Sequence, residues 1–215
     1  MRIAFATTSR ATSTRKICGA MADNLFEQPD NATPLRPEEA DALRVPVVDR
    51  RQLNEIEAAN VAEGRVWALR SRRNWFTDGY FCELHRRMFG SVWKWAGEYR
   101  MRDVYIGDTP PHQIAVKVRA ALDDARYWFE HESYGPHELA IRLHHRLVWI
   151  HPFVNGNGRC TRLLADVVVR RLKVDDLTWG SVSLVETGEA RTAYVAARKH
   201  ADNHNLEPLI AFARS

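Results

Sequence analysis

The sequence predicts a mostly α-helical domain with one small β-hairpin. Beyond residue 50, apolar residues recur at three- and four-residue intervals in most segments, which is the period of an amphipathic helix. Between Tyr99 and Gln113 the period falls towards two, and glycine and proline turn formers follow, which favours two short strands. A chain of 215 residues with 45% hydrophobic content can bury one core, so a single domain is expected.

The first fifty residues differ in composition from the rest. Residues 1–20 are rich in Ser, Thr, Arg and Ala and contain no acidic residue, which is typical of a disordered or transit-peptide-like leader. Translation from Met21 is the alternative interpretation. Four prolines within residues 21–50 predict an extended arm, with one helical turn after Pro37. The domain itself is expected to span residues 51–215.

The charge and cysteine content exclude several classes of protein. The chain has 31 Lys and Arg residues against 27 Asp and Glu residues, and four of the basic residues lie in the leader. The rest is therefore balanced, and no basic footprint for nucleic acid is present. Three scattered cysteines predict no disulfide framework and favour a reducing, cytoplasmic compartment. No apolar run is long enough for a membrane span, so no membrane partner is expected.

The helical segments can be placed in order along the chain. An amphipathic helix is expected over residues 53–69, interrupted or ended near Gly64. Thr77 is typical of an N-cap and opens the next helix. Further helical periodicity covers residues 115–131, 139–150, 163–172, 189–203 and 207–213.

The most informative stretch is residues 151–159, His-Pro-Phe-Val-Asn-Gly-Asn-Gly-Arg, which joins two of these helices. Its glycines allow the main chain to approach a ligand closely, and the N–H groups that open the second helix have no intrahelical partners. Together with the helix dipole, these N–H groups form an anion site. Arg159 and Arg162 lie three apart in the first turn, where both can reach phosphate oxygens. His151 supplies a titratable imidazole beside this site.

This stretch resembles the signature of the Fic (Fido) family: histidine-proline-phenylalanine-x-(aspartate or glutamate)-glycine-asparagine-glycine-arginine-x-x-arginine. Every fixed position matches except one, where Asn155 replaces the carboxylate. Four further stretches, residues 53–55, 83–90, 93–97 and 144–150, resemble the mobile mystery protein B branch of the family. The resemblance covers residues 21–215.

The resemblance implies a Fic-type helical bundle and a protein adenylyltransferase. In that reaction His151 is the general base that takes a proton from a side-chain hydroxyl of a target protein. The freed oxygen attacks the α-phosphate of ATP, the co-substrate, and pyrophosphate leaves. The implied nucleotide-binding residues are Gly156, Asn157, Gly158, Arg159 and Arg162.

The resemblance also implies a flap, a target-docking hairpin. Its docking residues would be Tyr99, Arg100, Val104 and Ile106. The sequence does not identify the target protein. The branch resembled here implies an association with mobile elements and a helix-turn-helix partner protein, as in a toxin–antitoxin pair.

Asn155 bears on the magnesium ion that the family uses. Magnesium prefers hard oxygen ligands, usually one or two carboxylates with phosphate and water. An amide oxygen at Asn155 would hold Mg²⁺ more weakly. Three outcomes stay open: a metal held mainly by ATP phosphates, a slower enzyme, or a nucleotide-binding protein with altered chemistry, including transfer of another nucleotide or phosphate group.

Glu63 and Gly64 partly match the Fic inhibitory motif, in which a hydroxyl residue lies four positions before the glutamate; here that position is Ala59. On this interpretation the helix over residues 53–69 restrains the enzyme, and Glu63 pairs with Arg162 so that the γ-phosphate is displaced. The alternative is a solvated helix glutamate.

Overall fold

The computed structural model describes residues 35–104, 106–181 and 188–215, and it confirms the mostly α-helical fold. The helices are α2 (Pro37–Ala40), α3 (Arg50–Arg70), α4 (Asp78–Phe89), α5 (Ile114–Glu130), α6 (Pro136–Ile150), α7 (Asn157–Arg171), α8 (Glu189–Asp202) and α9 (Glu207–Ala213). Two short 3-10 turns, η1 (Pro111–Gln113) and η2 (Trp179–Ser181), precede α5 and α8. The predicted leader lies outside the described residues.

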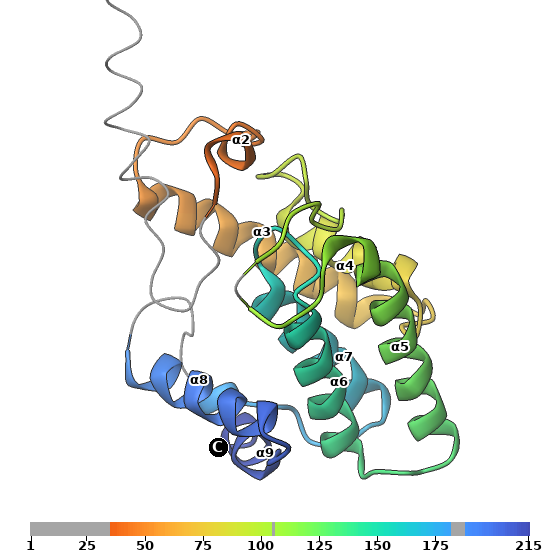
Figure 1. Cartoon of the computed structure of the whole chain (residues 1–215). Helices are drawn as coiled ribbons and strands as arrows, with labels where there is room; N and C mark the ends of the chain where they lie inside the picture. Colours follow the sequence, from red (N-terminus) through yellow and green to blue (C-terminus); the bar gives the residue numbers. More distant parts are fainter. Residues whose placement is uncertain (1–34, 105, 182–187) are drawn as a thin grey trace, which may run out of the picture.

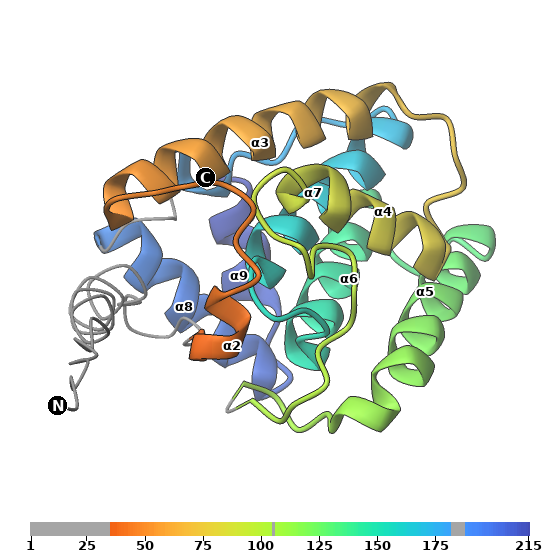
Figure 2. The same cartoon turned by 90° about the horizontal axis from the view of Figure 1, so that it is seen from above.

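The helices are arranged around the α6–α7 pair. α5 packs against one side of this pair, and α8 with α9 lies on the other side (Figure 1). α3 runs along the molecule across α4 and α7 (Figure 2). Residues 151–156, the first part of the motif over residues 151–159, connect α6 to α7. The motif is therefore supported by the most closely packed pair of helices.

The core consists of the apolar stripes that the sequence predicts. Leu143 and Leu147 of α6 and Leu164 and Val168 of α7 belong to one buried cluster, and all four residues have no exposed surface. Burial of each such side chain contributes about 1.5–3 kcal/mol. None of the helices in the described ranges combines the length and the apolar character needed to cross a bilayer.

α3 differs from its prediction at Gly64. Asp49 caps the helix by accepting from the Gln52 N–H at 2.8 Å, and the helix continues through Gly64 to Arg70. A Cβ at position 64 would lie 2.8 Å from Met88 Cγ and 2.9 Å from Met88 Cα. The expected interruption is therefore wrong: the glycine permits close packing of α3 on α4, and the cost of a glycine within a helix is offset by that contact.

α4 begins as predicted. The Thr77 side chain accepts from the Tyr80 N–H at 3.2 Å, which satisfies one of the open donors of the first turn. The remaining segment of the arm, residues 35–49, is tied to the loop after α4: Leu43 bridges Trp93, and the Lys94 N–H donates to Ala42 O at 2.9 Å.

The predicted hairpin over Tyr99–Gln113 is not formed in the described residues of that segment. Tyr99 instead makes an isolated antiparallel bridge to Phe153, and the Arg100 N–H donates to Pro152 O at 2.8 Å. The backbone groups needed for a hairpin ladder are thus used by the motif loop. The rest of the segment follows an irregular path to η1, held by Arg100.

Candidate functional site

The motif connects α6 to α7 through an unusual backbone turn at His151. This residue is the C-cap of α6, with φ 51° and ψ 58°, in the left-handed region that costs a non-glycine residue about 1–2 kcal/mol. Its N–H donates to Leu147 O at 3.1 Å. Backbone strain of this kind is concentrated at functional sites, where surrounding structure maintains it.

The hydrogen bonding of the His151 ring defines its tautomer. Nδ1 lies 3.3 Å from Val148 O, and because a carbonyl only accepts, Nδ1 carries the proton and Nε2 carries the lone pair. The side chain is 8% exposed, and this burial lowers the pKa of His151 to about 3; the charge of Arg100 acts in the same direction. The imidazole is therefore neutral at physiological pH.

Arg100 fixes the motif loop from the interior of the protein. Its side chain is 1% exposed, and its Nε donates to His151 O at 2.6 Å. Nη2 donates to Thr109 O at 2.6 Å and to Ile150 O at 3.3 Å, and Nη1 donates to Arg102 O. Two of these carbonyls belong to the negative end of the α6 dipole, which favours a buried cation. The predicted flap residue is thus an internal support, because its guanidinium is turned into the protein.

Asn157 closes the motif loop on itself. Its Nδ2 donates to Phe153 O at 2.9 Å, and its Oδ1 accepts from the Phe153 N–H at 2.9 Å. The amide was expected on phosphate oxygens, but both of its ends hold the loop in the described structure. Phe153 itself has no exposed surface and stacks on His85 with ring centroids 3.8 Å apart. The loop is therefore rigid before any ligand binds.

Gly156 and Gly158 form the start of α7. Gly156 has a φ of 76°, and a Cβ there would lie 2.6 Å from the Phe89 ring, so only glycine fits. It serves as the N-cap without a side-chain hydrogen bond. In the described part of the chain the first backbone N–H groups of α7 have no hydrogen-bond acceptor, so the anion site stays a prediction that this helix terminus is able to meet.

The two arginines of the motif turn in different directions, although their spacing predicts one face. Arg159 Nη1 donates to Glu57 Oε2 of α3 at 2.6 Å, and its guanidinium lies 4.6 Å from the centroid of Phe89. Arg162 turns towards α8: a Cβ at Gly158 would lie 3.3 Å from Arg162 Nη1. Arg162 is thus the arginine that borders the open N–H groups.

The side chain of Asn155 does not fit a magnesium site held by the protein. Its Oδ1 accepts from the Gly156 N–H at 2.5 Å and lies 3.5 Å from Arg159 Nη2. Within the described ranges, no group of three or more His, Cys, Asp and Glu residues is placed to hold a metal. A single amide oxygen already facing a guanidinium is a poor ligand for Mg²⁺.

The carboxylate that reaches the motif from α3 is Glu57. It is 6% exposed and accepts from Arg159 and from Trp93 Nε1, the latter at 2.7 Å. These two donors lower the pKa of Glu57 against the opposing effect of burial. Glu63 is exposed and makes no ion pair in the described part of the chain, and Arg162 likewise pairs with no carboxylate there.

His85 is a residue of the site that its sequence position did not reveal. It has no exposed surface; its Nδ1 accepts from the Gly97 N–H at 2.9 Å, so its Nε2 carries the proton and donates to Asn155 O at 3.0 Å. His85 therefore connects α4 and the loop after it to the motif. Its position on the buried face of α4 gives no sequence signal of a bond to the motif 70 residues away.

The other predicted flap residues lie on either side of Arg100 in the chain. Tyr99, Val104 and Ile106 are half-buried, whereas Met101, which the sequence did not single out, is 90% exposed. Gly107 packs so closely on α6 that a Cβ would overlap the carbonyl of Trp149. The segment is thus anchored at both ends beside His151.

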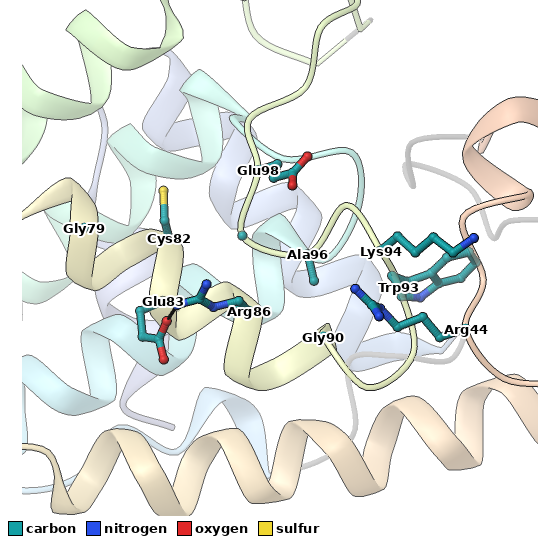
Figure 3. A pocket seen from close by; sticks show the side chains of 11 residues that line it. Arg44, Gly79, Cys82, Glu83, Arg86, Gly90, Trp93, Lys94, Ala96 and Glu98 are labelled. Carbon is teal, nitrogen blue, oxygen red and sulfur yellow. Dashed lines mark hydrogen bonds and ion pairs between the residues drawn. The ribbon is translucent and has the colours of Figure 1, made fainter.

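A hollow of about 340 Å³ lies beside α4 and the loop that follows it, apart from the motif (Figure 3). Arg44 and Lys94 project at one end, and Glu83 and Arg86 of α4 pair with each other at its centre. No residue of the motif lines it. Its connection to the site is indirect, through Gly97 and His85.

Comparison with known proteins gives a family match for part of the chain. Residues 75–169 match the model of the Fic/DOC family. A protein adenylyltransferase Fic of Drosophila mojavensis is 30% identical over 164 residues, which cover 74% of this chain and 31% of that protein. The chain thus spans about a third of the length of this curated relative.

Two solved structures are similar in fold. A fragment of Caenorhabditis elegans Fic-1 matches 74% of this chain and 48% of its own, with 27% identity and a TM-score of 0.58. BepC, a VirB-translocated effector protein of Bartonella tribocorum solved with AMPPNP bound, matches 83% of this chain and 97% of its own, with 17% identity and a TM-score of 0.63. The relation to the adenylyltransferases is distant.

Buried neutral histidines predict loss of stability in mild acid. Burial lowers the pKa of His85 and of His151 to about 3, and holds the pKa of His144 well below 6.5. The unfolded chain takes up protons below its histidine pKa of about 6.5 that the folded chain does not, so stability present above pH 6.5 is lost as pH falls towards 3. Urea unfolding between pH 7.5 and 5.5 should show a loss of about 1 kcal/mol per histidine per pH unit below 6.5.

The substitution His85→Gln should make this pH dependence shallower, since glutamine does not titrate. The exposed residue His112 provides the matched control, and His112→Gln should leave the slope unchanged. Equal stability of the unaltered protein at pH 7.5 and 5.5 would contradict the assignment of neutral histidines.

Proposed function

We propose that this chain, a Fic/DOC family protein over residues 75–169, transfers AMP from ATP to a side-chain hydroxyl of a target protein. The observation that carries the proposal is the arrangement of one loop. A neutral imidazole with its lone pair on Nε2 lies at one end of the loop, and an uncapped helix N-terminus lies at the other. A general base beside an anion site is what nucleotidyl transfer to a hydroxyl requires.

In this reaction the hydroxyl proton moves to His151 Nε2 as the hydroxyl oxygen bonds to the α-phosphorus of ATP. The bond between that phosphorus and the bridging oxygen to the β-phosphate breaks, and pyrophosphate leaves with the electron pair. The N–H groups at the start of α7 would stabilise charge on the phosphate oxygens. A base with a pKa of about 3 accepts a proton weakly, and the negative charge of bound ATP would raise that pKa.

A second candidate is a catalytically weak, nucleotide-binding member of the family. It is favoured by Asn155, whose oxygen faces Gly156 and Arg159 and offers no carboxylate to a metal. Magnesium would then come only with the ATP phosphates. The helix-turn-helix partner and the association with mobile elements are further parts of the proposal, supported by sequence resemblance alone.

We also propose that α3 restrains the site, through Glu57 and not through Glu63. The Glu57 carboxylate engages the guanidinium of Arg159 in a largely buried pair. Such a charge-assisted contact is strong enough to compete with a phosphate for the guanidinium. Release of α3 would return one more cation to the nucleotide.

The first prediction concerns the base. His151→Ala should reduce transfer of labelled AMP by about 100-fold or more, which is the contribution of a general base, while ATP still binds because the cradle of N–H groups is unchanged. Transfer is measured with α-labelled ATP, and binding by calorimetry. Transfer at the unaltered rate would overturn the mechanism; binding without transfer in the unaltered protein would establish the second candidate.

The second prediction concerns restraint. Glu57→Gln should raise AMP transfer by about five-fold or more, the usual scale of coupling between sites, because Arg159 is released. Glu63→Gln is the matched control on the same helix and should transfer at the rate of the unaltered protein. Both variants are compared at equal folded concentration. Lower transfer in Glu57→Gln would show that the pair supports the site, and activation by Glu63→Gln would restore Glu63 as the restraining residue.

A further inference from the structure

Arg162 rests on an aromatic ring from a distant part of the chain. Its Cζ lies 5.1 Å from the ring centroid of Tyr194, which belongs to α8. The π face of a tyrosine attracts a guanidinium at this separation. In the part of the chain that the structure describes, no carboxylate forms an ion pair with Arg162, and Asp166 interacts with its charge only at longer range. Arg159, by contrast, is held by Glu57.

Tyr194 is itself held in place. The ring is 7% exposed, and its hydroxyl lies 3.1 Å from Nε2 of His144, which is 1% exposed. Burial keeps His144 neutral, so the pair carries no charge that would repel Arg162. Phe212 of α9 lies on another side of Tyr194, with ring centroids 5.9 Å apart. These contacts hold the Tyr194 ring, here called the platform for Arg162, in one orientation.

The platform lies at the anion site. A Cβ added at Gly158, the second residue of α7, would lie 3.3 Å from Arg162 Nη1 and 3.9 Å from the Tyr194 hydroxyl. The guanidinium and the phenol thus converge beside the open N–H groups. α8 in this way contributes a residue to a site built mainly from the α6–α7 connection and the first turns of α7.

We infer that Tyr194 is a positioning residue that holds Arg162 ready for the distal phosphates of a nucleoside triphosphate, with His144 fixing the orientation of Tyr194. The inference rests on the proposed function, because it takes the ligand of the α7 N-terminus to be ATP. The inference adds a determinant of specificity. Discrimination between a nucleoside triphosphate and a monophosphate would depend on the Tyr194 ring, which need not contact the nucleotide.

The test measures that discrimination in the full chain carrying His151→Ala, which prevents turnover. Dissociation constants for ATP and for AMP are measured by calorimetry at one magnesium concentration. Tyr194→Leu removes the π face and should weaken ATP binding by about five-fold or more, the scale of a desolvated cation–π contact. AMP binding, which lacks the distal phosphates, should change by less than about two-fold. Tyr194→Phe keeps the π face and should retain most of the preference for ATP.

A double-mutant cycle separates positioning from a structural role. With Arg162→Ala already present, Tyr194→Leu should have no further effect on ATP binding, because its effect passes through the arginine. Equal weakening of ATP and AMP by Tyr194→Leu, or additive effects in the cycle, would overturn the inference and make Tyr194 a packing residue.

A nucleotide-free measurement keeps the inference distinct from the proposed function. The ring current of Tyr194 should shift the Arg162 Nε–H proton resonance upfield, and Arg162→Lys identifies that resonance. The shift should remain in Tyr194→Phe and disappear in Tyr194→Leu. An unshifted resonance in the unaltered protein refutes the platform even if ATP binds, whereas a shifted resonance without any ATP binding refutes the proposed function and the role inferred from it.

Discussion

The buried guanidinium of Arg100 is the interaction on which the site depends. A buried cation with 1% exposure must have its donors paired, and four hydrogen bonds join this guanidinium to the carbonyls of His151, Ile150, Thr109 and Arg102. Those carbonyls belong to two segments that have no regular pairing with each other. One arginine therefore holds the left-handed turn at the end of α6 and the path of the 100–109 segment at the same time. Loss of that cation would leave several carbonyls without donors in a buried place, each costing about 1–3 kcal/mol.

Most polar side chains of the site already form internal hydrogen bonds or ion pairs in the absence of a ligand. Asn157 is committed to Phe153, Asn155 to Gly156, and Arg159 to Glu57. In the proposed reaction the groups that act on the nucleotide are the backbone N–H groups of α7, the His151 imidazole and Arg162. Groups held in place by such internal contacts need little reorganisation when charge develops, which is the physical basis of electrostatic preorganisation. The signature residues thus divide into those that build the loop and those that face the nucleotide in the proposed reaction.

The helices could be predicted from sequence because their signals are local, and the anion site is a prediction drawn from equally local signals. The Thr77 side chain caps α4 by accepting from the N–H three positions ahead. The apolar stripes of α6 and α7 can be identified from their own periodicity. The errors came from contacts between distant residues. Tyr99 and Arg100 pair with the motif loop, so the expected hairpin is absent from the described residues, and Gly64 admits Met88, so α3 is not interrupted. Nothing near Arg159 in the sequence indicates Glu57, 102 positions away, and nothing near Arg162 indicates Tyr194.

The attachment of α3 has a consequence for how it could move. Three polar ties join it to α7 in parallel order: Glu57 to Arg159, Arg65 to Asp166, and the Ser71 carbonyl to Arg171. Between them, Gly64 brings the helix backbone against Met88 so closely that it cannot slide along its own axis without a steric clash. Departure of α3 would therefore be cooperative, with amide protons along its whole length exchanging in a single event. If α3 restrains the site as proposed, the restraint would therefore have two states and no intermediate one.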